Sequence, residues 1–172
     1  MSENQEPELP DTPIEGMSPA AGHRVDDFWD SVQTKLDERG RIKLPTEIRE
    51  FLERKYGKGF NEFYITSMDG ETAEIYPLPE WLARRGRINA MPQSHSLREQ
   101  LSRLYSRFGK QASMDPQGRM PIREELREEA DMTGEVTVTW EGNLLRVTTM
   151  KLLRATPKLT PQQRDELKNF NL

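Results

Sequence analysis

The sequence has 172 residues, no cysteine and only two histidines, His23 and His95. Without cysteine the chain can form neither disulfide bonds nor thiolate metal sites. No apolar run approaches the ~18 residues that a membrane-spanning helix needs. The first ten residues, MSENQEPELP, lack the basic and apolar regions of a secretion signal. These absences predict a cytoplasmic protein. The length of the chain predicts one compact domain or two very small ones.

The few histidines and the glycines give little support to an enzyme. His23 lies in an acidic segment and His95 in a connecting stretch, where we expect an exposed helical residue. Neither stands at a catalytic or metal-binding spacing from a serine or a carboxylate. Gly57 and Gly59 fit the end of a helix better than a phosphate-binding loop. We therefore expect no catalytic residue, metal, cofactor or small-molecule substrate.

Charge is unevenly distributed along the chain. The 29 acidic and 25 basic residues give a net charge of −4, which by itself disfavours a nucleic-acid partner. Residues 1–31 carry −7, however, so the remainder carries +3. Residues 1–25 are rich in Pro, Glu and Ser, and we interpret them as a disordered acidic tail, with folded structure beginning near Phe28. Its carboxylates would compete with phosphate for a basic surface.

A duplication is the most informative feature of the sequence. The segment LDERGRIKLPTEIRE (36–50) aligns without a gap with MDPQGRMPIREELRE (114–128), at a constant offset of 78. The two segments share turn residues, alternating apolar residues and helix charges. Six residues recur: Asp37 as Asp115, Gly40 as Gly118, Arg41 as Arg119, Glu47 as Glu125, Arg49 as Arg127, and Glu50 as Glu128. This agreement predicts two copies of one structural unit.

Each copy predicts a strand, a turn with Asp and Gly, a second strand, a helix and a hairpin. In the second strand of the first copy, Ile42 and Leu44 fall on one face, and Arg39, Arg41 and Lys43 fall on the other. The following helix carries an apolar stripe, and we expect it to begin at an N-cap supplied by Thr46. The predicted organisation is an acidic tail (1–25), a first repeat (26–90), a helical connector (91–111), a second repeat (112–150) and a C-terminal helical extension (151–172) whose last helix is capped by Thr160.

Residues 28–150 resemble the MraZ family, bacterial transcription regulators built from two swapped-hairpin domains of the AbrB type. The strongest marks are DERGR (37–41) and DPQGR (115–119), and secondary marks are YPLPEW (76–81) and GNLLRV (142–147). The resemblance implies an α+β fold in which two AbrB-like repeats interleave into one small β-barrel with flanking helices. It also implies a ring-shaped homo-oligomer, often an octamer. Such rings bind repeated boxes in double-stranded DNA upstream of the division and cell wall gene cluster, usually as a repressor, and this predicts a nucleoid-associated protein.

The two turns supply the candidate site. We expect DNA contacts from Arg39, Arg41, Lys43, Gln117 and Arg119, with Asp37, Gly40, Asp115 and Gly118 orienting the motif. A two-stranded ribbon fits the major groove, where an arginine can bind O6 and N7 of guanine with two hydrogen bonds. Asp37 is then placed to orient Arg41 rather than to touch anionic DNA. The alternative is a purely structural ion pair across a glycine turn.

The second copy is the weaker candidate. Residues 32–60 carry +3 and residues 114–150 carry −4. Three basic or turn positions also change: Gln117 replaces Arg39, Pro121 replaces Lys43, and Arg123 replaces Pro45. We therefore predict that the first copy dominates DNA affinity.

The basic stretch of residues 81–113, which includes the connector, leaves two explanations open. It carries +6, which suits either contact with phosphates or pairing with acidic residues of a neighbouring chain. An AbrB-like protein-interaction or antitoxin module is the alternative function for the whole chain. The antitoxin form is disfavoured because such proteins usually carry one copy followed by a toxin-binding tail.

Overall fold

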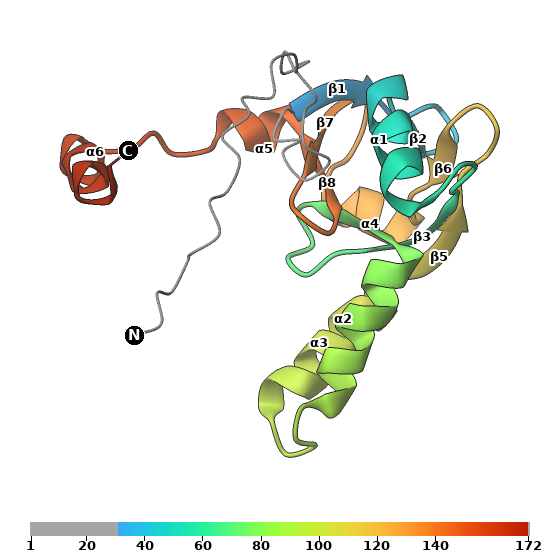
Figure 1. Ribbon diagram of the computed structural model, residues 1–172, viewed down its shortest axis with the longest axis horizontal. Coiled ribbons are helices and arrows are strands. Elements are labelled where there is room, and N and C mark those ends of the chain that lie inside the picture. Colours follow the sequence, from blue (N-terminus) through green and yellow to red (C-terminus); the bar gives the residue numbers. More distant parts are fainter. Residues whose placement is uncertain (1–30, 172) are drawn as a thin grey trace, which may run out of the picture.

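The computed structural model describes residues 31–171, and it is an α+β structure in which both copies form the same elements (Figure 1). The first copy comprises β1 (Ser31–Lys35), β2 (Arg41–Lys43), α1 (Thr46–Tyr56), β3 (Glu62–Thr66) and β4 (Ala73–Pro77). The second comprises β5 (Lys110–Ser113), β6 (Arg119–Pro121), α4 (Glu124–Glu129), β7 (Glu135–Trp140) and β8 (Leu145–Thr149). Helices α2 (Leu78–Ala90) and α3 (Ser96–Phe108) connect the copies, and α5 (Met150–Arg154), α6 (Pro161–Leu167) and the 3₁₀ helix η1 (Lys168–Phe170) follow them.

The strands of the two copies are interleaved within shared sheets. The larger sheet has the order β1-β7-β8-β4-β3-β5, and all of its neighbours are antiparallel. Each copy thus lends its first strand to the hairpin of the other copy: β1 pairs with β7, and β5 pairs with β3. Strands β2 and β6 pair with each other in a separate two-stranded ribbon. The order reads the same from either edge when equivalent strands are exchanged, which gives the molecule an approximate two-fold symmetry.

The expected barrel is not closed by hydrogen bonds within residues 31–171. Strands β1 and β5 are the two edges of the larger sheet and do not pair with each other. The ribbon is joined to the first edge by a single bridge between Leu36 and Ile42. The chain leaves β1 through a tight turn in which Gly40 has a φ of 70°, and this turn interrupts the ladder.

The main core lies between the sheets and helices α1 and α4, and both copies contribute to it. Ile42 and Met120, which are partners in the ribbon, are fully buried. Phe51 of α1 contacts Trp140 of β7 edge to face, with 4.9 Å between ring centroids. The predicted apolar face of the first helix is confirmed, because Phe51 is buried together with Ile48 and Leu52. The two copies therefore share one core.

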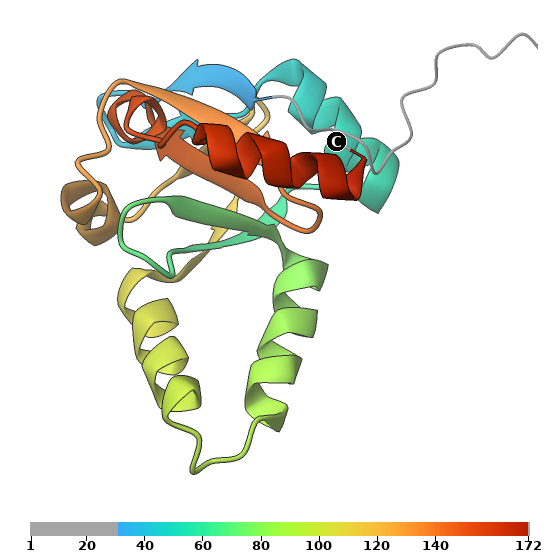
Figure 2. The ribbon, with the colours of Figure 1, turned by 90° about the vertical axis from the view of Figure 1, so that its left-hand side faces the viewer.

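Helices α2 and α3 form an arm that projects from the larger sheet (Figure 2). A second, smaller cluster of buried residues fastens the base of this arm. In it, Trp81 of α2 stacks on Tyr64 of β3 at 4.0 Å and meets Tyr105 of α3 edge to face at 5.1 Å. The two helices of the arm are separate elements, since α2 ends at Ala90 and α3 begins at Ser96.

The structure corrects the expected start of α1. Pro45, not Thr46, occupies the N-cap position, and no side chain caps the helix there. Thr46 is the first helical residue, and its hydroxyl accepts a hydrogen bond from Nη2 of Arg49 at 3.1 Å. The predicted end is confirmed: Gly57 follows the helix with a φ of 110°. Pro45 occupies the N-cap position with an extended ψ of 151°, and its side chain has no acceptor that could cap the helix.

Two other caps are settled by the structure. His95 is the N-cap of α3 rather than a residue within a helix, and its Nδ1 accepts a hydrogen bond from the backbone N–H of Leu97 at 3.3 Å. Thr160 caps α6 as predicted, in a capping box with Gln163. Figure 1 shows α6 apart from the sheets. The acidic tail and Phe28 lie outside the described residues, and no described helix is long and apolar enough to cross a membrane.

Candidate nucleic-acid interface

The two Asp-x-x-Gly-Arg turns have the same backbone geometry. In the first, the N–H of Asp37 donates to the carbonyl of Arg41 and the N–H of Gly40 donates to the carbonyl of Asp37, both at 2.9 Å. The second turn repeats both bonds at 2.9 Å between the equivalent residues. Gly40 and Gly118 have φ values of 70° and 80°, a conformation that favours glycine. The backbone of the turn therefore explains why the glycine recurs in both copies.

An aspartate holds the arginine in each turn. Oδ2 of Asp37 accepts a hydrogen bond from Nε of Arg41 at 2.8 Å and forms an ion pair with Nη2 of Arg41 at 2.7 Å, while Oδ1 accepts a hydrogen bond from the backbone N–H of Arg41 at 2.9 Å. In the second turn, Oδ2 of Asp115 accepts from Nε of Arg119 at 3.0 Å. The backbone N–H of the arginine, above all, lowers the pKa of each aspartate below its usual value. Both carboxylates are thus kept charged beside their arginines.

The ribbon places three basic side chains on its outer side. Residues directly opposite each other in β2 and β6 are Arg41 and Pro121, Ile42 and Met120, and Lys43 and Arg119. Because Ile42 and Met120 point into the core, the residues on either side of them in each strand point away from it. Arg41, Lys43 and Arg119 consequently share the outward side of the ribbon.

The other two candidate residues lie at the turn tips. Arg39 is exposed within the first turn, before β2 begins, so the expectation that it shares a strand face with Arg41 is wrong. Gln117 takes the same place in the second turn, where its Oε1 accepts a hydrogen bond from Nη2 of Arg119. Arg119 is therefore held by two side chains of its own turn, Asp115 and Gln117.

Strand β1 adds a basic residue that the sequence reasoning missed. A hollow of about 400 Å³ lies beside the ribbon and is lined by Lys35 together with Arg41, Lys43 and Arg119. Its other lining residues are Gln33, Thr34, Asp37 and Glu135. Four bases against two acids make this hollow positively charged. Alternation along β1 could have identified Lys35 as an outward residue, because Leu36 beside it is buried.

The second copy does not repeat this lining. The residues equivalent to Lys35 and Lys43 are Ser113 and Pro121. Arg123, which replaces a proline, contacts neighbouring residues of the second copy and the connector. It forms an ion pair with Glu125 at 2.9 Å and donates a hydrogen bond to the carbonyl of Gly109 at 3.2 Å. The positive charge of the ribbon is consequently concentrated on the side of the first copy.

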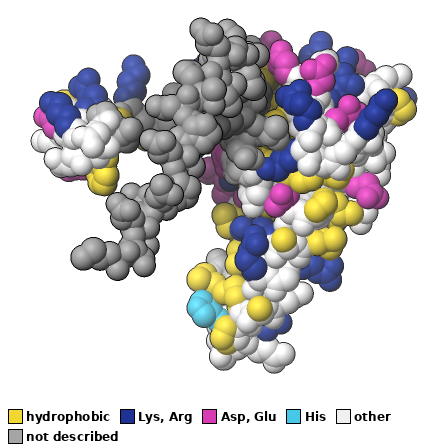
Figure 3. Space-filling view, in the orientation of Figure 1, with side chains coloured by type: hydrophobic (Ala, Val, Ile, Leu, Met, Phe, Trp, Pro, Cys, Tyr) yellow, Lys and Arg dark blue, Asp and Glu magenta, His cyan; other side chains and the backbone are white. Residues whose placement is uncertain are grey.

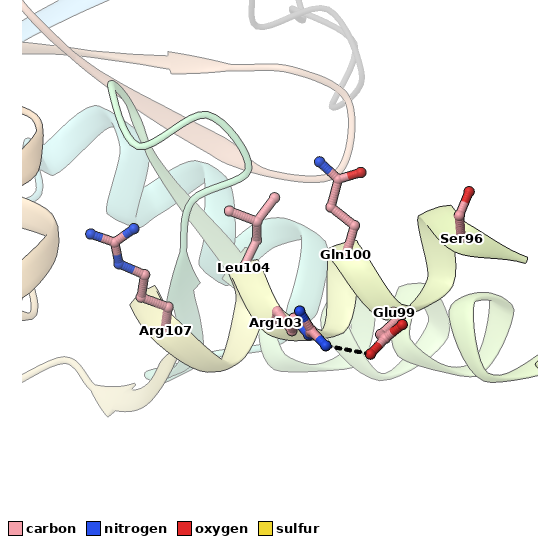
Figure 4. A pocket seen from close by; sticks show the side chains of 6 residues that line it. All are labelled: Ser96, Glu99, Gln100, Arg103, Leu104 and Arg107. Atoms are coloured by element: carbon pink, nitrogen blue, oxygen red, sulfur yellow. Dashed lines mark hydrogen bonds and ion pairs between the residues drawn. The ribbon is translucent and has the colours of Figure 1, made fainter.

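Several basic side chains of residues 81–113 interact with other residues of the same chain. Arg84 donates to the Tyr105 hydroxyl from Nε and Nη2 at 2.9 and 2.7 Å, and Arg107 pairs with Glu129 of α4 at 2.7 Å. A hollow of about 420 Å³ follows one face of α3, where Figure 4 shows the Arg103–Glu99 ion pair among its lining residues. Within residues 81–113, the basic residues that form no ion pair with a described residue include Arg85, Arg87 and Lys110. Figure 3 shows basic side chains on both the arm and the sheet region.

The chain is similar in sequence to known bacterial transcription regulators. No model of a known protein family matches the chain. The chain is nevertheless 32% identical over 133 residues to Transcriptional regulator MraZ of Acidobacterium capsulatum, which covers 77% of this chain and 89% of the relative. It belongs to the MraZ family.

Other relatives agree with this assignment. The protein of the same name from Koribacter versatilis is 35% identical over 105 residues, covering 61% of this chain and 70% of the relative. The one from Bordetella pertussis is 33% identical over 116 residues, covering 67% and 77%. The resemblance predicted from the two turns is confirmed.

Within residues 31–171, no group of three or more His, Cys, Asp or Glu residues is arranged to hold a metal ion.

Proposed function

We propose that this MraZ-family chain is a sequence-specific DNA-binding transcriptional regulator that contacts double-stranded DNA through the β2–β6 ribbon and its two turns. One observation carries the proposal: Arg41, Lys43 and Arg119 share the outward side of a two-stranded ribbon, and an aspartate fixes each arginine. The major groove admits such a ribbon, and bases of the DNA are distinguishable there.

The turn geometry suits a fixed arginine fork. Asp37 binds Nε and Nη2 of Arg41, and a guanidinium has five N–H donors, so further donors stay available for guanine. A guanidinium held in advance loses less conformational entropy on binding. Lys35 and Lys43 suit phosphate contacts, because an ammonium acts as a point charge. Arg39 and Gln117 extend the contact from the turn tips.

The family resemblance extends the proposal to a biological role. The chain would act as a repressor of the division and cell wall gene cluster, bind repeated boxes in its promoter, and assemble into a ring in the nucleoid. These features rest on resemblance to MraZ proteins. A protein-interaction module is the second candidate, and it is favoured by Leu82 and Leu97 on the arm, which are 55% and 52% exposed.

Titration of the full chain onto labelled DNA tests the proposal. One duplex comes from upstream of the protein's own gene and the other is a scrambled duplex of equal composition, both measured at several salt concentrations. Wild type should prefer the upstream duplex, and the double variant Arg41→Ala/Arg119→Ala should lose that preference. Arg164→Ala, which removes an exposed arginine of α6, should keep it. Equal binding of both duplexes by wild type, or retained preference in the double variant, would reject the proposal.

A further inference from the structure

Each turn is covered by an arginine from the other copy. Arg127 belongs to α4 of the second copy, yet its guanidinium lies against the backbone of Gly40 in the first turn. The space is so close that a Cβ on Gly40 would overlap Cζ and Nε of Arg127. The guanidinium is held in this position by a hydrogen bond, which Nε of Arg127 donates to the carbonyl of Ile122 at 3.1 Å. A planar group thus fills the space that a side chain at Gly40 would need.

The second turn has the reciprocal arrangement. Arg49 of α1 lies against Gly118, where a Cβ would be 2.8 Å from its Cδ and 2.9 Å from its Nε. Its Nη2 donates to Thr46, and its Nε is buried without a hydrogen bond. Arg49 and Arg127 are equivalent residues of the duplication, so equivalent side chains cover both turns, and the approach is closer at Gly40 than at Gly118.

Backbone hydrogen bonds follow the same crossed pattern. The N–H of Ile122, in the second copy, donates to the carbonyl of Gly40 at 3.1 Å. The N–H of Leu44, in the first copy, donates to the carbonyl of Gly118 at 2.8 Å. Each turn is therefore connected to the other copy through both its glycine carbonyl and its glycine Cα.

We propose that Arg127 and Arg49 are positioning residues for DNA recognition, each holding the turn of the opposite copy. The proposal rests on the function proposed above. Arg41 directly follows Gly40, so movement of that peptide moves the arginine fork. A recognition group must stay within about 0.5 Å of its productive position, and supporting residues provide this precision. Loss of Arg127 should thus weaken the contribution of Arg41, and loss of Arg49 should weaken that of Arg119.

Double-mutant cycles on the full chain test the crossed pattern. Arg127→Met keeps a long side chain without a guanidinium, and it should weaken binding to the upstream duplex about fivefold, a size typical of coupled residues. In the Arg41→Ala background the same change should have almost no further effect. In the Arg119→Ala background it should keep its full effect. Arg49→Met should show the opposite dependence.

A charge-conserving variant separates positioning from a direct phosphate contact. Arg127→Lys should weaken binding as Arg127→Met does, because an ammonium cannot replace a planar guanidinium against a backbone. Wild-type affinity in Arg127→Lys would assign a phosphate contact and overturn the inference. Circular dichroism checks folding of each variant, and if Arg127→Met is unfolded, the cycle is carried out with Arg127→Lys.

The outcomes distinguish this inference from the proposed function. If Arg41→Ala and Arg119→Ala leave DNA binding unchanged, the proposed function fails. If they weaken binding but Arg127 couples to Arg119, or adds independently to both, the proposed function stands and the crossed positioning is wrong.

Discussion

At the residue scale, the two arginines of the turns differ in which side chains hold them. Arg41 is held by Asp37, whereas Arg119 is held by both Asp115 and Gln117. Each arginine engages Nε and Nη2 within its own turn, so both have the same number of donors left for DNA. What distinguishes them is their surroundings, because the second copy carries less positive charge.

The first prediction concerns these arginines separately. Arg41→Ala should cost about 1–3 kcal/mol of specific binding, the range for a good bidentate contact to a base. Arg119→Ala should cost less, because the surroundings of Arg119 are less basic than those of Arg41. Dissociation constants for the upstream duplex, measured at one salt concentration, make the comparison. A larger loss in Arg119→Ala would contradict it.

The second prediction concerns the aspartate of the first turn. In Asp37→Asn, the amide oxygen can still accept the backbone N–H groups of Arg39 and Arg41, but the charge that holds the Arg41 guanidinium is lost. We expect a smaller ratio of upstream to scrambled affinity, with stronger binding to scrambled DNA because one acid is removed. Titrating both duplexes measures the ratio. An unchanged ratio would show that Asp37 does not orient Arg41 for recognition.

The pH dependence of this interaction follows from the pKa of Asp37. Hydrogen bonds from Arg41 lower that pKa in the folded chain, so the stabilisation is fully present above the unfolded value of about 3.9. It is lost as the pH falls through the lower folded value. Neither Asp37 nor Asp115 should therefore make DNA binding change between about pH 5 and 8.

At the element scale, local patterns predicted most of the secondary structure. Strand alternation in β2 and the helix end at Gly57 depend on neighbouring residues, and both are confirmed. The pairing of β1 with β7 and the contact of Arg127 with Gly40 depend on residues far apart in the chain. A single sequence has no local signal for such contacts, so they were found only in three dimensions.

The candidate site was predictable to a similar extent. The recurrence of Asp37 and Arg41 as Asp115 and Arg119 identified the turns, and alternation identified the outward side of β2. Lys35 was missed because it precedes the motif and reaches the hollow only through the position of β1 beside the ribbon. Motif spacing therefore located the arginines but not the full basic surface around them.

The ribbon yields a third prediction, a gain of affinity. Pro121 is exposed and lies opposite Arg41 in the ribbon. Its equivalent in the first copy is Lys43. Pro121→Lys should tighten DNA binding and steepen its salt dependence by up to about 0.9 in the log–log slope, the value for one phosphate contact. Pro121→Thr controls for loss of the proline, and Gln162→Lys controls for charge added elsewhere. Equal effects of the two lysine variants would place the DNA away from the ribbon.

At the scale of the whole molecule, the interleaved strands make the two copies depend on each other. Within residues 31–171, β1 has β7 as its only ladder partner, and β2 has only β6. The core also mixes both copies, as Phe51 and Trp140 show. A fragment holding one copy would expose apolar surface and unpaired strands.

The fourth prediction is that neither half folds alone. A fragment of residues 31–109 should lack cooperative unfolding, and adding residues 110–172 should restore native circular dichroism. The intact chain should unfold in one transition in which fluorescence and circular dichroism coincide. A cooperative transition in the isolated first fragment would contradict this expectation.

The fifth prediction concerns the acidic segment at the N-terminus. Residues 1–31 carry −7 and lead directly into β1, whose Lys35 lines the basic hollow. Deleting residues 1–25 should tighten DNA binding at low salt, with the gain shrinking as salt screens the charges. A variant with its acids between residues 1 and 25 replaced by Gln or Asn should behave like the deletion. Unchanged affinity in both would show that these carboxylates do not compete with DNA.

The approximate two-fold symmetry also bears on the DNA sequence to be read. Two identical subunits related by a two-fold axis present identical reading surfaces, so their site is a palindrome. Here the two turns belong to one chain and differ at their tips, with Arg39 in one and Gln117 in the other. Exchanging the ends of the DNA site would therefore match each turn with the wrong half. The site of one chain should have a direction, and that direction fixes how the chain is oriented along the promoter.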